Sequence, residues 1–194
     1  MVTKLSAASL IVYSATMIAG LGFQQLKGDE SNIVSKPFKI SGSGTVTHIP
    51  LPTPDNPTPD PGIHTADGTA TNLGKHSSIG YVQLDEFTSA TTATFSSAHP
   101  VVFTGANGEQ LAFDYAGIVT LTPALDEAGN PTGQFTSEWV ADFTPVPDSS
   151  TGKYKNVVGS SFEMTARTGL FYVTDTDIPY SWDGEGTLQW LEEE

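Results

Sequence analysis

An uncharged stretch from Leu5 to Leu26 constrains this chain more than any other feature of its sequence. The stretch has 22 residues, lies between Lys4 and Lys27, and contains no charged side chain. At the rise of an α-helix, a segment of this length spans roughly 33 Å, which is enough to cross the hydrocarbon core of a bilayer. The sequence therefore predicts one N-terminal transmembrane helix over residues 1–27, followed by structure of a different kind.

The alternative to a retained anchor is a signal peptide that is removed after export. The short segment Met1–Lys4 fits the start of a signal peptide. The uncharged run, however, is longer than the usual apolar region of roughly 7–15 residues. The best small-x-small candidate for cleavage is Gly20-Leu21-Gly22, which departs from the Ala-x-Ala pattern. These two departures favour a signal-anchor that stays attached to the protein.

Charges beside the stretch predict its orientation in the bilayer. Lys4 and the terminal amine precede it, whereas Asp29 and Glu30 soon offset Lys27 on the other side. Because positive charge is retained on the cytoplasmic side, we expect a single-pass membrane protein with a cytoplasmic N-terminus. The rest of the chain is then periplasmic or extracellular.

Small residues within the predicted span offer a packing surface for another helix. Ala15 and Ala19 form one pair four residues apart, and Thr16 and Gly20 form a second pair beside it. Small residues at this spacing let two helices approach closely in a bilayer, and a threonine hydroxyl can hydrogen-bond across the contact. Such pairs also arise by chance in an Ala- and Gly-rich segment. The partners expected here are the lipid bilayer and other membrane protein subunits.

Composition narrows the range of partners and chemistries. The chain has 8 Lys and Arg against 22 Asp and Glu, which gives a formal net charge of −14. Because nucleic acids and anionic membrane surfaces attract basic proteins, we expect no nucleic-acid partner and no binding of the soluble part to such surfaces. The chain has no cysteine, which excludes disulfides, thiolate metal sites and cysteine nucleophiles.

The chain after the predicted anchor divides into three parts. Residues 28–36 are predicted as a polar tether, residues 37–190 as an extracytoplasmic β-domain, and residues 191–194 as an acidic tail. Within the domain, residues 50–61 contain six prolines. Because proline fixes φ and lacks a backbone donor, this segment is predicted as an extended loop outside the ladder.

Strand signals are dense from residue 37 onward, and turn signals separate them. Alternation places Leu111, Phe113 and Tyr115 on one face, and it does the same for the aromatic residues of Gln134–Phe143, so both sets are predicted as core. Short strands at even spacing predict an all-β fold, an antiparallel β-barrel or sandwich of about eight strands. The predicted strand segments are 37–49, 68–73, 77–87, 90–97, 101–104, 110–115, 118–125, 134–144, 160–168 and 185–190.

Turn motifs in the second half resemble those of a known family. Thr151-Gly152-Lys153-Tyr154, followed by Gly159, is similar to a T-G-x-[YF] turn ahead of a long strand in the allene oxide cyclase and dirigent type of β-barrel. Segments 103–108 and 184–188 fit the same arrangement. The resemblance covers roughly residues 68–190 and implies a barrel. In those families acidic residues in the cavity carry function, but none of them maps onto this sequence residue by residue. The resemblance therefore implies no catalytic residue.

Carboxylates are the only abundant polar groups, and one cluster is a candidate cation site. Asp126, Glu127 and Asn130 lie in a single predicted turn. Hard oxygen ligands of this kind suit Ca²⁺, although the spacing does not match the EF-hand loop. Asp and Asn also form turns without any metal. No other metal or cofactor is expected.

Two glutamates are candidates for acid–base chemistry, and the four histidines are candidates for metal binding. Glu138 and Glu163 lie within predicted strands, where an inward carboxylate would suit acid–base chemistry, but alternation with Trp139 predicts that Glu138 faces solvent. The histidines lack the i,i+2 or i,i+4 spacing of zinc sites and are expected to have solvent or hydrogen-bonding roles. They are His48, His64, His76 and His99.

These observations predict a non-catalytic, membrane-anchored accessory or structural subunit of a larger membrane complex. A bioenergetic assembly such as a photosynthetic reaction centre would suit the plan of one anchor and one extracytoplasmic domain. The anchor carries this prediction, since no catalytic set is recognisable. Two alternatives remain: a barrel that binds a small apolar ligand, and a cyclase- or isomerase-like enzyme that uses a cavity carboxylate.

Overall fold

The computed structural model describes residues 33–52 and 55–191 of the chain. The predicted span, with Ala15, Thr16, Ala19 and Gly20, lies outside the described residues. In the described part, no helix is both long enough and apolar enough to cross a bilayer.

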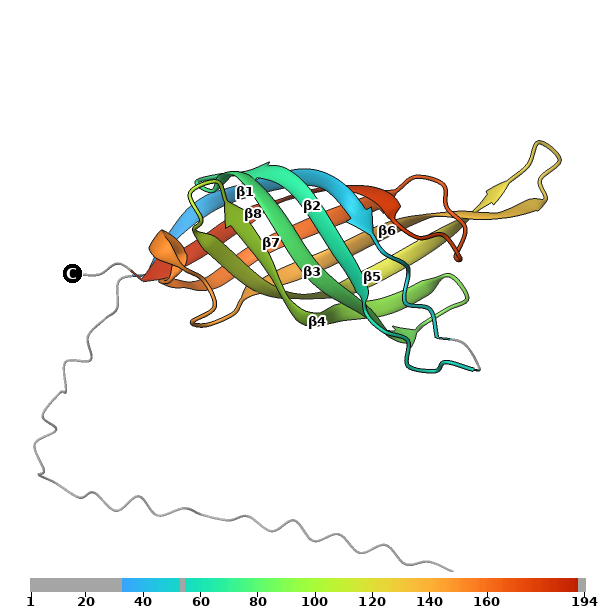
Figure 1. The fold of residues 1–194 in the computed structure, drawn as a ribbon, viewed down its shortest axis with the longest axis horizontal. Coiled ribbons are helices and arrows are strands. Elements are labelled where there is room, and N and C mark those ends of the chain that lie inside the picture. The colour runs from blue at the N-terminus through green and yellow to red at the C-terminus, as the bar shows by residue number, and fades with distance from the viewer. Residues whose placement is uncertain (1–32, 53–54, 192–194) are drawn as a thin grey trace, which may run out of the picture. The chain divides into compact units, whose positions relative to one another are not determined.

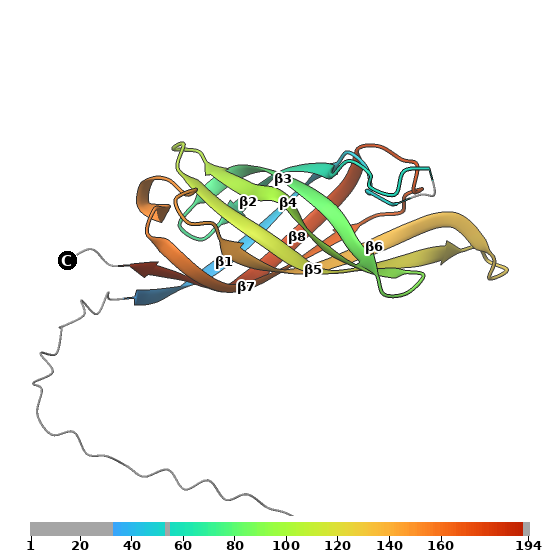
Figure 2. The ribbon, with the colours of Figure 1, turned by 90° about the horizontal axis from the view of Figure 1, so that it is seen from below.

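Eight antiparallel strands form one sheet that closes on itself (Figure 1). Each strand pairs with its neighbours in chain order, and the first strand also pairs with the last, so the sheet is a closed barrel. Figure 2 shows the same closed arrangement from a second direction. The strands are β1 Ile33–Val46, β2 Gly62–Ala70, β3 Gly74–Phe87, β4 Thr92–Gly105, β5 Gln110–Leu125, β6 Pro131–Pro145, β7 Val157–Thr168 and β8 Ile178–Leu191.

The expected all-β antiparallel fold of eight strands is confirmed, with a single closed sheet in place of two packed sheets. Two pairs of predicted segments are continuous strands. Residues 92–97 of one predicted segment and 101–104 of the next belong to β4, where the pairing with β5 shifts between Ser96 and Val101. Residues 110–115 and 118–125 belong to β5, which runs through Gly117. The described part contains no α-helix, only a short 3₁₀ turn, η1 Gly152–Tyr154, ahead of β7.

Several predicted boundaries were wrong. Strand β1 begins at Ile33, so residues 33–36 of the predicted tether pair with β8, and Leu191 of the predicted tail belongs to β8. Strand β2 begins at Gly62, six residues before the predicted start. Its sequence GIHTADGTA has few β-branched or aromatic residues, so local propensity is weak. Pairing with β1 and β3 on both sides overrides that weak propensity.

Aromatic side chains fill the half of the barrel nearest to Ile33 and Leu191. Phe162 packs against Phe38 with ring centroids 5.2 Å apart, and against Phe143 with centroids 4.8 Å apart. Phe113 and Phe103 extend the cluster through further edge contacts. All five rings are at most 4% exposed, so this half of the interior is closed to solvent.

The opposite end of the barrel is covered by the loop that joins β1 to β2, residues 47–61, which contains the Pro-rich segment and is termed the Pro-rich loop. Ile49 and Pro50, near the start of this loop, are buried. Ile49 packs near Leu84, Val119 and Trp139 from three other strands. The remainder of the described loop is mostly exposed. The apolar Ile49–Pro50 segment therefore closes the mouth of the barrel, and the acidic proline-rich part lies outside.

Strands β5 and β6 continue past the other strands as a long hairpin, seen in yellow and amber in Figure 1. The β7–β8 connection supports its base, because Phe135 and Phe171 exchange two backbone hydrogen bonds of 2.8 and 2.9 Å. Phe171 is buried at this contact, whereas its neighbours Leu170 and Tyr172 are exposed.

Candidate functional site

An apolar cavity of about 90 Å³ lies inside the barrel, between the aromatic half and the covered mouth. Every strand contributes to its wall, and Ile49 of the Pro-rich loop contributes to its cover. Its lining residues are Val46, Ile49, His64, Ser78, Val82, Phe95, Val101, Phe103, Tyr115, Trp139, Ala141, Phe143, Met164, Ala166, Thr168, Tyr180 and Trp182.

Three of these residues form a hydrogen-bonded chain across the cavity. His64 Nε2 lies 2.8 Å from the hydroxyl of Tyr115, and His64 Nδ1 lies 3.3 Å from the hydroxyl of Tyr180. The residues come from β2, β5 and β8, which are far apart in sequence. Closure of the sheet brings them together, and alternation along each strand points all three inward.

Burial determines the charge state of this chain of groups. It lowers the pKa of His64 from 6.5 to about 4, because the surrounding apolar walls disfavour the charged imidazolium. Burial also raises the pKa of Tyr115 and of Tyr180, in each case by disfavouring the phenolate. At neutral pH the imidazole and both phenols are therefore uncharged.

The imidazole of His64 has room because residue 80 is glycine. Gly80 pairs directly with His64 across β2 and β3, and both positions face the interior. A methyl group at position 80 would overlap the imidazole ring and crowd Val101. The glycine therefore allows the ring of His64 to lie over the neighbouring strand and reach both tyrosines.

The predicted cation cluster forms a turn. The Asp126 carboxylate accepts backbone N–H bonds from Ala128 and Asn130, at 2.9 and 2.8 Å, and the side-chain amide of Asn130 donates to it as well. These donors lower the pKa of Asp126, with the Asn130 backbone contributing most. Among the described residues, no group of three or more His, Cys, Asp or Glu is arranged to hold a metal. The turn geometry thus accounts for Asp126 and Asn130, and Glu127 takes no part in the bonds described here.

Glu138 and Glu163 lie on the outside of the barrel. The carboxylate of Glu138 accepts a hydrogen bond of 2.9 Å from Arg167 Nε, across β6 and β7, in agreement with the prediction that it faces solvent. None of the described residues that line the cavity is an Asp or a Glu. The cavity therefore has no carboxylate of the kind that the cyclase-like alternative needs.

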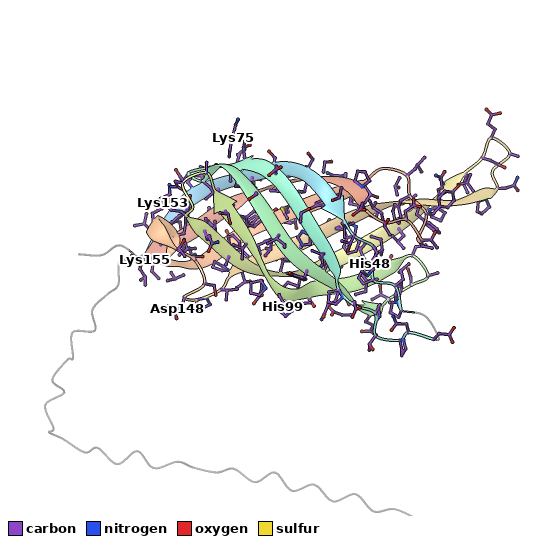
Figure 3. All side chains as sticks on the ribbon, in the orientation of Figure 1. His48, Lys75, His99, Asp148, Lys153 and Lys155 are labelled. Carbon is purple, nitrogen blue, oxygen red and sulfur yellow. The ribbon has the colours of Figure 1, made fainter. Side chains whose placement is uncertain are left out.

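The other three histidines do not join His64. His48 bonds the backbone carbonyl of Asp60 in the Pro-rich loop, and His99 packs against Tyr81 on the outer surface. Figure 3 shows that His48 and His99 are well separated on the molecule. His76 is buried against Phe103 and Trp182, where desolvation lowers its pKa.

Sequence reasoning did not single out the trio of His64, Tyr115 and Tyr180. Tyr115 was predicted only as core, and position 64 fell outside the predicted strands because β2 was placed too late. The available signal was alternation in Gly62–Ala70, where Gly62, His64 and Ala66 share one face. A histidine between small inward residues on a barrel strand indicates a site where the ring has space.

Comparison with protein-family models, with curated proteins and with solved structures finds no match to this chain. The resemblance to the allene oxide cyclase and dirigent type of barrel therefore stays a prediction.

Proposed function

We propose that the barrel binds a small, neutral, largely apolar molecule in its interior. The observation that carries this proposal is the cavity of about 90 Å³, which is walled by apolar side chains and crossed by the Tyr115–His64–Tyr180 chain. Protein interiors are normally packed without voids of this size. An interior built only for stability would fill the space with larger side chains at positions such as Ala141 and Ala166.

The lining restricts the charge of the ligand. No Lys, Arg, Asp or Glu is among the described lining residues. Burying an unpaired charge in such a site costs far more than burying a hydrogen-bonded polar group. The cavity is also smaller than the engineered apolar cavity of about 150 Å³ that holds benzene. The ligand is therefore uncharged and smaller than benzene.

A titration with two small probes tests the proposal. The probes are 2-methyl-1-butene, a hydrocarbon, and 2-butanone, which has the same shape with a carbonyl in place of the terminal methylene group. We expect saturable binding of at least one probe to the full chain in mild detergent, followed by protein NMR. Ala166→Leu fills the cavity and should abolish binding, whereas Ala116→Leu, at an exposed position on β5, should leave it unchanged. Absence of saturable binding by both probes would refute the proposal.

A second candidate function is that of a membrane-anchored accessory subunit, and the uncharged stretch from Leu5 to Leu26 is the observation that favours it. A stretch of this length is enough to cross the hydrocarbon core of a bilayer as a helix.

Extraction in mild detergent followed by size determination separates this second function from the first. An accessory subunit should elute in a complex larger than its own 20.5 kDa, with its N-terminus intact by mass spectrometry. A lone monomer with a processed N-terminus would contradict the accessory role and leave the ligand proposal standing.

A further inference from the structure

His64, Tyr115 and Tyr180 together have three polar hydrogens, but the two hydrogen bonds that join them use only two. A neutral imidazole has one N–H and one lone pair, and each phenol has one O–H. Two hydrogen bonds join the three groups, so they use two of the three hydrogens. One tyrosine must donate to the lone pair of the imidazole, and the other must accept from its N–H. The accepting tyrosine keeps its own hydrogen for another partner.

The two distances indicate which tyrosine that is. The Tyr115 contact of 2.8 Å is the shorter of the two, as expected where a phenol, the more acidic donor, donates to the lone pair of the imidazole. The Tyr180 contact of 3.3 Å is longer, as expected where the imidazole N–H, the weaker donor, donates to the phenol oxygen. We therefore assign the tautomer in which Tyr115 donates to Nε2 and Nδ1–H donates to Tyr180. In this tautomer the Tyr180 hydrogen has no acceptor among the described residues.

The other hydroxyls of the lining already have partners in the protein. Ser78 donates to the backbone carbonyl of Ala66, and Thr168 bonds with Ser137. Trp139 Nε1 also donates to the Ser137 hydroxyl, at 2.7 Å. The hydroxyl of Tyr180 is therefore the phenolic donor of the cavity that still needs an acceptor.

We propose that Tyr180 donates a hydrogen bond to a single acceptor atom of the bound molecule, a neutral carbonyl or ether oxygen. A buried donor without an acceptor is costly, so the site favours a ligand that supplies one over a pure hydrocarbon of the same shape. This inference rests on the proposed function and adds to it the chemical class of the ligand. Tyr180 acts here as a specificity-determining residue.

The same pair of probes tests the inference through its difference in affinity. The carbonyl and the methylene group differ in their cost of leaving water, so the quantity measured is the ratio of the two affinities in the wild-type chain divided by the same ratio in Tyr180→Phe. We expect this quotient to be about ten in favour of 2-butanone, the difference expected from one buried hydrogen bond. Tyr180→Phe should remove this preference, mainly by weakening the binding of the ketone. The matched control is Tyr81→Phe, because Tyr81 packs against His99 on the outer surface and does not line the cavity.

A spectroscopic measurement supports the inference independently of the variants' stability. The ¹³C resonance of the bound ketone carbonyl should lie further downfield in the wild-type protein than in Tyr180→Phe, because a donated hydrogen bond polarises the carbonyl. An affinity ratio that is the same in the wild-type protein and in Tyr180→Phe, or an identical carbonyl shift in both proteins, would overturn the inference while leaving the proposed function intact. Failure of both probes to bind would overturn the proposed function and this inference together.

Discussion

The pairing of Gly80 with His64 shows how one missing side chain creates a site. Most inward positions of the barrel carry large residues that fill the interior, but a glycine opposite His64 leaves the ring free to turn across β3. Without that space the imidazole could not lie between two tyrosines that come from β5 and β8. The site therefore depends on a residue that takes no part in any of its hydrogen bonds.

Gly80→Ala is expected to destabilise the protein by about 1–3 kcal/mol, because the new methyl group overlaps the His64 ring in a packed interior. Denaturant unfolding measures the change. Gly169→Ala is the matched control, since a methyl group there meets no atom within 4 Å and the variant should be nearly neutral. The double variant Gly80→Ala with His64→Ala should cost less than the sum of the two single changes, because removal of the ring relieves the overlap. Additive effects would contradict this account.

The lowered pKa of His64 predicts a specific loss of stability in acid. The pKa of the folded state, about 4, lies below the ordinary value of 6.5, so the unfolded chain binds more protons between these two values. The stability is fully present above pH 6.5 and decreases as the pH falls toward 4. Between about pH 7.5 and pH 4.5 we expect the wild-type protein to lose about 2–3 kcal/mol more than His64→Gln.

Unfolding free energies of the two proteins across this pH range check the prediction. Carboxylates and His76 titrate in both proteins, so the difference between the two curves isolates the contribution of His64. Two parallel curves would show that the imidazole is solvated in the folded state.

At the scale of elements, the Pro-rich loop has two parts with different tasks. Its first residues, Ile49 and Pro50, are buried at the mouth of the barrel, and the acidic part that follows lies outside. Ile49 touches both the central cavity and the smaller apolar space under Phe87 and Leu121. Ile49 therefore separates the cavity from the outside of the barrel at this end.

Ile49→Ala is expected to lower the free energy of unfolding by about 2 kcal/mol. This value is near the low end for truncation of a buried isoleucine, because Ile49 already borders the open space of the cavity. The same change should speed the release of bound 2-butanone, since the cover of the cavity becomes thinner. Stopped-flow displacement and denaturant unfolding measure the two effects. Ile79→Ala, at an exposed position on β3, should change neither by a comparable amount. An unchanged release rate in Ile49→Ala would show that ligands leave by another route.

The elements predicted correctly from sequence are those whose residues carry a local signal. Alternating aromatic residues in β5 and β6 predicted both strands and their inward faces. Strand β2 was placed late because its small and polar residues form a strand only between two neighbours. The cavity trio is a product of closure, since His64 and Tyr180 lie 116 residues apart in the sequence and have no pattern in common. No local rule can predict such a contact.

At the scale of the whole molecule, the seam between β1 and β8 determines the closed form. All 14 residues of β1 pair with β8, from Ile33 opposite Leu191 to Val46 opposite Ile178. The seam also holds Tyr180 at a fixed distance from His64 on β2, because β1 lies between β8 and β2. The geometry of the candidate site and the stability of the fold thus depend on the same ladder.

A disulfide across this seam should stabilise the barrel. Ser43 and Ser181 are paired residues on the outer face of β1 and β8, and the chain has no native cysteine to form competing bonds. Oxidised Ser43→Cys with Ser181→Cys should gain about 2–4 kcal/mol, because the crosslink restricts the unfolded chain across most of its length. The reduced form of the same variant is the control. If the oxidised form is less stable than the reduced form, the two strands are not paired in this register.

The seam has a further consequence for how the barrel forms. Its two strands are the first and the last of the described chain, so their ladder has the highest contact order in the molecule, and contacts of this kind form slowly. Until β8 is synthesised, the edge of β1 remains unpaired, and an unpaired edge can recruit a strand from another chain. Strand exchange between copies is therefore a hazard of the unfinished chain alone. The hazard of strand exchange ends when β8, Ile178–Leu191, pairs with β1, because no described strand of the completed barrel then has a free edge.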